Sequence, residues 1–192
     1  ENHGNECDAR GQCSKLTGGA GADIHIIADG GSKLRDLPWG RDGNEFCQGH
    51  QCWIGAAEQA LTSTSKRQPR CAELIAARAV AHNGHDGLNT PDGHRNDLSR
   101  HHPQPDFHHF ATDAEGQRLI TDAGPRDGGG ALWLGTLPQD ETSGIGDWTY
   151  LLNPRSSWQK NSHIHPFLSP DGKTAFFNSD ESGVLQCYML RY

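Results

Sequence analysis

The stretch 161–192 constrains the fold more than any other part of the chain, because short apolar runs alternate there with tight polar turns. The segment 169–172 (SPDG) has the composition of a turn: proline presets φ, aspartate accepts from its own backbone, and glycine tolerates positive φ. Apolar runs at 174–178 and 184–190 flank a second polar turn at 179–183. Strand, tight turn and strand at this spacing predict one blade of a β-propeller.

The same pattern recurs upstream, and a histidine opens each copy. His165 precedes Gly172 by seven residues, as His109 precedes Gly116, and a weaker copy begins at His50. The steps between these histidines, 59 and 56 residues, exceed the ~40–50 residues of a typical blade, which predicts blades with long inserted loops. Equivalent positions of successive blades surround the central channel of a propeller. We therefore expect the three histidines to converge on one point.

The fold that we predict is an all-β propeller with about three to four recognisable blades, part of a seven-bladed propeller. The chain has 192 residues, whereas seven blades need roughly 300 or more, so it belongs to a larger protein, lacks segments or closes by self-association. We expect a polar N-terminal arm at 1–22 and blades over 23–192. The window 70–81 fits a helix by composition, but its place in the repeat favours a strand.

Charge and hydropathy exclude two classes of partner. The net charge of −7 does not attract a polyanion, and no basic stripe is present, so we expect no nucleic-acid partner. An acidic ligand would need a local cationic pocket. No apolar run approaches the ~18 residues of a membrane-spanning helix, so we expect no membrane partner.

The six cysteines allow two interpretations. An even number favours disulfides in a secreted or periplasmic protein, with fifteen conceivable pairings. A cysteine zinc site is the alternative, although neither Cys7/Cys13 nor Cys47/Cys52 has C-x2-C spacing.

Two stretches resemble the oligogalacturonate-lyase-like propellers, a group that also covers ulvan lyases. One is 102–110 with the blade that follows it, and the other runs from Ser-Ser-Trp at 156–158 to HIHPFLSPDG at 163–172. The resemblance covers residues 100–192 and, more loosely, 45–80. It implies cleavage of a uronic-acid polysaccharide by β-elimination, with a divalent metal (Mn, Ca or Zn) held by channel histidines.

The resemblance assigns the metal to His109 and His165, and the repeat adds His50. The family pattern has a glutamine shortly before the second histidine. In this chain the nearest is Gln159, and Ser162 occupies the closer position.

Elimination from a uronate requires a base for the C5 proton, a cation beside the carboxylate and a proton donor for the leaving oxygen. Histidine, arginine and tyrosine have suitable chemistry, and two long loops at 81–109 and 139–162 supply them. Our candidates are His85 and His102 as base or acid, Tyr150 as proton donor, Arg155 for the carboxylate, and Arg100 and Trp148 for substrate binding.

Plainer roles compete with these assignments. Each channel histidine could cap a strand, the histidine-rich loop could be a solvated segment, and four aspartates are predicted turn formers: Asp113, Asp122, Asp171 and Asp180. Three functions remain open: a secreted lyase acting on an acidic polysaccharide or oligosaccharide, a non-catalytic propeller that binds a glycan or a protein, and a metal-dependent hydrolase or metal carrier.

Overall fold

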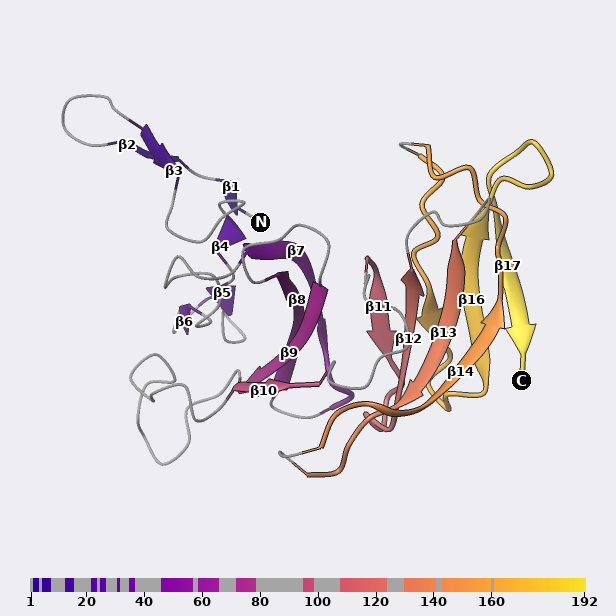
Figure 1. Ribbon diagram of the computed structural model, residues 1–192, viewed down its shortest axis with the longest axis horizontal. Helices are drawn as coiled ribbons and strands as arrows, with labels where there is room; N and C mark the ends of the chain where they lie inside the picture. The colour runs from indigo at the N-terminus through magenta and orange to yellow at the C-terminus, as the bar shows by residue number, and fades with distance from the viewer. Residues whose placement is uncertain are drawn as a thin grey trace. The chain divides into compact units, whose positions relative to one another are not determined.

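The computed structural model shows an all-β chain (Figure 1). It describes residues 46–56, 59–65, 72–78, 95–98, 108–123, 130–140, 143–159 and 161–192, together with residue 31 and six short strands before residue 37. No helix long and apolar enough to cross a membrane occurs in this described part of the chain. The chain divides into two compact units, Glu1–Gln51 with Glu58–Asp97, and Cys52–Ala57 with Leu98–Tyr192.

The first unit contains a four-stranded antiparallel sheet in the order β10-β9-β8-β7. Its strands are β7 (Phe46–Trp53, of which the last two residues belong to the second unit), β8 (Gln59–Ser65), β9 (Ala72–Arg78) and β10 (Arg95–Asp97). β9 confirms the prediction of a strand rather than a helix in the window 70–81. Leu61 and Thr62 of β8 are fully buried.

Among the described residues, the first unit also contains three two-stranded sheets. They pair β1 (Asn2–His3) with β4 (Ala22–Asp23), β2 (Asn5–Cys7) with β3 (Cys13–Lys15), and β5 (His25–Ile26) with β6 (Arg35–Asp36).

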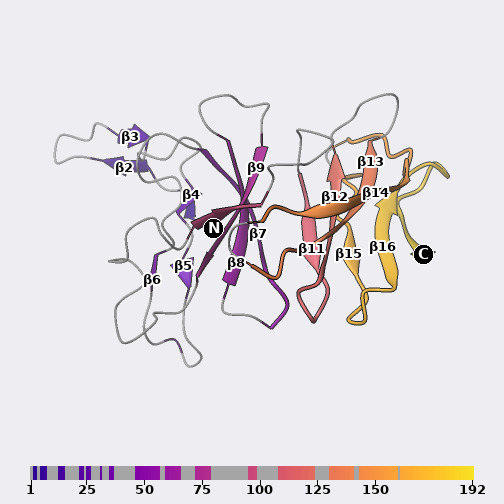
Figure 2. The ribbon, with the colours of Figure 1, turned by 60° about the horizontal axis from the view of Figure 1, so that its bottom comes forward.

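The second unit contains two antiparallel sheets that follow each other along the chain. The four-stranded sheet has the order β11 (Phe110–Thr112), β12 (Arg118–Ala123), β13 (Ala131–Thr136), β14 (Gly146–Leu152). The three-stranded sheet has the order β15 (Phe167–Leu168), β16 (Thr174–Ser179), β17 (Gln186–Arg191). Figures 1 and 2 both show the second sheet alongside the first.

The two sheets of the second unit share an apolar core. Side chains alternate along β16, so Ala175 and Phe177 face inward while their neighbours are more exposed. Ala175 packs with Ile120 of β12 and Leu168 of β15, and Phe177 packs with Leu132 of β13 and Ile164. Successive antiparallel meanders that pack face to face in this way are the arrangement of propeller blades.

The turns after β11 and β15 are built alike, since the Gly116 N–H donates to the Asp113 carbonyl at 3.2 Å and the Gly172 N–H donates to the Ser169 carbonyl at 2.8 Å. Asp113 accepts hydrogen bonds from the backbone N–H groups of Gln117 and Arg118 at 2.7 and 3.0 Å, and Asp171 accepts one from Lys173 at 3.2 Å. The predicted turn roles of Asp113 and Asp171 are therefore confirmed.

The same prediction for Asp122 was wrong. Asp122 lies within β12 with none of its surface exposed, and its carboxylate binds His109. The error arose because an aspartate that ends an apolar run resembles a turn residue until its long-range partner is known.

Candidate metal centre

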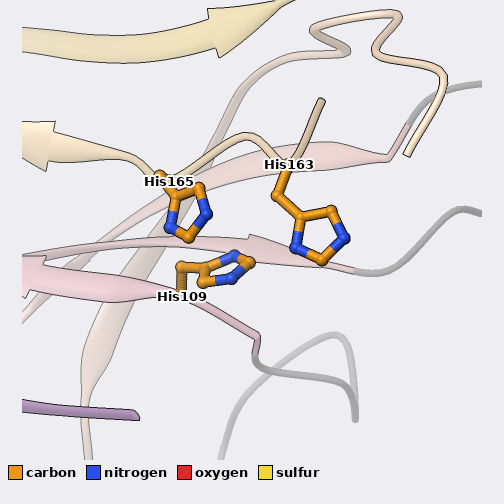
Figure 3. Close-up of side chains that lie close together, drawn as sticks. All are labelled: His109, His163 and His165. Carbon is orange, nitrogen blue, oxygen red and sulfur yellow. The ribbon is translucent and has the colours of Figure 1, made fainter. Parts of the chain in front are cut away.

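His163 and His165 are held in place by the residue between them. Ile164 is fully buried against Leu132 and Phe177, and its carbonyl accepts a 2.7 Å hydrogen bond from the backbone N–H of Asn178. Ile164 is the buried residue of the three, whereas His163 is half-buried and His165 is exposed, so burial of Ile164 anchors the segment while the two flanking histidines remain accessible. Figure 3 shows both rings on the same side of this segment.

His109, which immediately precedes β11, is fixed by β12. The backbone N–H of Asp122 and the hydroxyl of Thr121 both donate to the His109 carbonyl at 3.1 Å. In return, the His109 backbone N–H donates to Asp122 Oδ1 at 2.6 Å, and the ring Nδ1 lies 2.8 Å from Asp122 Oδ2. One buried carboxylate therefore holds both the main chain and the ring of His109.

The three imidazoles converge (Figure 3). The ring centroids of His109 and His165 are 3.9 Å apart, and that of His163 is 5.4 Å from His109 and 5.8 Å from His165. One ligand nitrogen from each ring can be chosen so that all lie within 4.8 Å of one another. Burial and the neighbouring His109 hold the pKa of His165 below its ordinary value, which favours the neutral, metal-binding form.

These residues fit a divalent transition metal. Imidazole is a common ligand for such ions, and a metal-binding histidine usually donates its second ring N–H to a carboxylate. His109 and Asp122 have that relationship. Three imidazoles suit manganese or zinc better than calcium, which prefers six to eight oxygen ligands.

Trp158 lies beside the histidines. Its ring centroid is 6.4 Å from that of His109, at an interplanar angle of 27°, and 5.6 Å from that of His163. Gly130, at φ 82°, permits this approach, since a Cβ there would lie 2.7 Å from the Trp158 indole nitrogen. Trp158 therefore forms a half-buried wall of the candidate site.

The loop that carries Trp158 is braced against the turn after β16. Ser157 donates to the Asp180 carboxylate through its backbone N–H at 2.8 Å and its hydroxyl at 2.5 Å. These two bonds lower the pKa of Asp180 to about 2. The Ser156 hydroxyl donates to the carbonyl of Ser162.

Three bulky residues of this segment have positive φ: Arg155 (52°), Trp158 (57°) and His165 (43°). Non-glycine residues in this conformation are strained and persist where the surroundings hold them.

The predicted metal ligands His109 and His165 come together, and His163 is the third member of the group. His50 lies in β7 of the first unit, where its carbonyl accepts a bond from Thr62 at 3.1 Å, and its role stays a prediction. Sequence analysis missed His163, although the HIH motif offered a signal: the aliphatic residue between two histidines is the one of the three that is expected to be buried.

The other predicted site residues are not members of the histidine group or lie outside the described residues, and their roles stay predictions. His85, Arg100 and His102 belong to the latter group. Tyr150 of β14 is 51% exposed and meets Trp133 edge-on, with centroids 5.3 Å apart. Arg155 pairs at 2.8 Å with Glu181 on the surface.

Trp148 of β14 packs within the sheet: a Cβ on Gly135 would lie 3.0 Å from its ring. A platform for sugar stacking needs an accessible ring face, and this half-buried packing leaves that role a prediction.

Two cysteines have described side chains. Cys52 and Cys187 are free thiols, so neither supports the expected disulfides. Burial raises the pKa of Cys52 to about 12, which keeps it protonated.

Comparison with known proteins identifies the fold. No protein-family model and no curated protein matches the chain. Among solved structures it is similar to an oligogalacturonate lyase in complex with manganese (17% identity, TM-score 0.64, 87% of this chain and 40% of that one). It is also similar to the oligogalacturonate lyase of Vibrio parahaemolyticus (17%, 0.59, 87% and 41%) and to TolB of Acinetobacter baumannii (14%, 0.60, 88% and 35%).

The chain thus spans about two-fifths of the length of the lyases that it matches. Antiparallel sheets without an α-helix in the described residues, together with these neighbours, show that the chain has the β-propeller fold.

Proposed function

We propose that this chain forms part of a β-propeller lyase that cleaves an acidic, uronate-containing polysaccharide by β-elimination. The observation that carries the proposal is the convergence of His109, His163 and His165, of which His109 contacts the buried carboxylate of Asp122. The likeness to an oligogalacturonate lyase in complex with manganese supports it.

In this proposal His109, His163 and His165 hold a divalent metal, of which manganese or zinc suits the ligands best. The bound ion would supply positive charge beside the uronate carboxylate and so make the C5 proton more acidic. Asp122 keeps the His109 ring in place, and Trp158 lies beside that ring.

Proton transfer needs further groups. We assign removal of the C5 proton to a histidine of the 81–109 segment, His85 or His102, and protonation of the leaving oxygen to Tyr150. Arg155 would bind a substrate carboxylate in place of Glu181, and because this pair is well exposed the exchange costs little. Arg100 and Trp148 are further substrate-binding candidates. We expect the protein to be secreted or periplasmic, where a polymeric substrate would be available.

The proposal is tested by incubating the purified chain, loaded with manganese or zinc, with pectate and other uronate polysaccharides. Elimination creates an unsaturated uronate that absorbs in the ultraviolet, and a neutral glucan serves as the control substrate. We expect absorbance to rise with the uronate polymers only and to stop when a chelator is added. A protein that binds metal but never produces the chromophore on any uronate would overturn the proposal.

A second candidate is a non-catalytic propeller that binds a glycan or a protein, because TolB matches the chain about as well as the lyases do. Binding to a uronate polymer that survives the His163→Ala change, without chromophore, favours this candidate. Chelator-sensitive cleavage without chromophore instead indicates a hydrolase.

A further inference from the structure

We infer that Asp122 is a positioning residue that sets the tautomer of His109, so that Nε2 is the nitrogen presented to a cation. The inference rests on the proposed function only in treating the histidine group as a metal site. Its evidence is the two-point contact between the Asp122 carboxylate and His109.

The first contact fixes the orientation of the carboxylate. Asp122 Oδ1 accepts from the backbone N–H of His109 at 2.6 Å, and the same residues are joined in the opposite direction by the Asp122 backbone N–H and the His109 carbonyl at 3.1 Å. Asp122 has no exposed surface, so no solvent competes for these bonds. The carboxylate therefore cannot rotate without leaving a buried donor unsatisfied.

The second contact fixes the ring. Asp122 Oδ2 lies 2.8 Å from His109 Nδ1, and an ionised carboxylate only accepts hydrogen bonds. Nδ1 must therefore carry the proton. In a neutral imidazole with Nδ1–H, the lone pair is on Nε2, the nitrogen farther from Asp122.

Asparagine at position 122 would reverse this arrangement. Its oxygen would have to accept from the backbone N–H of His109, because the amide nitrogen there would place two donors face to face. The amide nitrogen would then point at Nδ1, which must become the acceptor, and the ring proton would move to Nε2. A loss of catalysis caused by the wrong tautomer is known for the aspartate-to-asparagine change in a serine-protease triad.

The test compares the wild-type chain with Asp122→Asn. Long-range proton–nitrogen NMR spectra are recorded on the metal-free protein at a pH where the His109 imidazole is neutral. They should show His109 as the Nδ1–H tautomer in the wild type and as the Nε2–H tautomer in the variant. Titration with Mn²⁺ should show about 10–100-fold weaker binding in the variant, the range typical for loss of an outer carboxylate partner.

Thr121→Val is the matched control. Thr121 is also fully buried and also binds His109, but through the backbone carbonyl rather than the ring. This change should leave the tautomer and the Mn²⁺ affinity as in the wild type, even where it lowers stability. If Thr121→Val weakens binding as much as Asp122→Asn, the effect is general loosening and the inference fails.

Two other outcomes also contradict the inference: an Nε2–H tautomer in the wild type, or an unchanged tautomer and Mn²⁺ affinity in Asp122→Asn. Neither readout depends on polysaccharide cleavage. A chain that shows the predicted tautomers and affinities but cleaves no uronate polymer therefore overturns the proposed function alone.

Discussion

The rings of His109 and His165 lie 3.9 Å apart between centroids, although each histidine opens a different sheet of the propeller. Two charged imidazolium groups at this separation would repel each other strongly. Burial beside His109 accordingly lowers the pKa of His165. Neutral rings, or a cation bound between them, avoid this repulsion, as expected for a metal centre.

The first prediction concerns the ligands themselves. His163→Ala and His165→Ala each remove one of the three converging imidazoles. Loss of a residue that only hydrogen-bonds a metal ligand typically weakens metal binding about 10–100-fold. Loss of a ligand itself should lower the Mn²⁺ affinity by at least that factor. Isothermal titration or the electron paramagnetic resonance of free Mn²⁺ measures the change. His108→Ala is the control, since His108 neighbours Trp158 but is not in the ligand group. Equal affinity in all three variants would exclude this cluster as the binding site.

A second prediction concerns Ile164, the residue between the two histidines. Ile164→Ala should lower the free energy of unfolding by about 2–5 kcal/mol, because it leaves a cavity beside Leu132 and Phe177. Ile164→Val should cost only about 0.5–1.5 kcal/mol. Urea denaturation of the metal-free protein measures both, and a loss as small for alanine as for valine would contradict the packing of Ile164 against Leu132 and Phe177.

A third prediction concerns pH. Ser157 lowers the folded-state pKa of Asp180 to about 2, below the ordinary value near 4, so the stabilisation is present above pH ~4 and is lost as pH falls through the folded pKa. The difference in denaturation midpoint between wild type and Asp180→Ala should be constant above pH ~5 and shrink toward pH ~2. Glu181→Gln, which alters only the exposed pair with Arg155, should show little effect. A difference that grows on acidification would refute the assignment.

The fourth prediction compares two glycines with positive φ. A Cβ on Gly172 (φ 65°) would lie 2.8 Å from Asp113 Oδ2, whereas a Cβ on Gly183 (φ 85°) would meet no heavy atom within 4 Å. Both alanine variants incur backbone strain of about 1–2 kcal/mol. Gly172→Ala should be destabilised further, because it forces apart two turns that are also joined by the bond from Ala114 N–H to the Pro170 carbonyl. Thermal unfolding compares them, and equal losses would show that the turns do not interlock.

The sequence predicted those parts of the fold that local pattern determines. The SPDG turn, the strands that flank it and the repeated position of His109 and His165 depend on alternation and turn chemistry within a few residues. Asp122 could not be assigned in this way. Its partner His109 lies across a strand pair, and a buried aspartate and a turn aspartate have the same letter and similar neighbours.

His163 was missed for a different reason. Counting from one blade to the next identifies one histidine per repeat and passes over a second histidine that belongs to a single copy. The HIH motif at 163–165 carried the missing information, because an aliphatic residue between two histidines indicates one buried and two more accessible side chains.

One consequence of the buried position of Ile164 concerns how this region tolerates change. A single tripeptide anchors the blade and presents two of the three imidazoles. A substitution at position 164 should therefore affect both the stability of the fold and the binding of metal. A randomised library at that position, selected only for metal retention, should return aliphatic residues of similar volume.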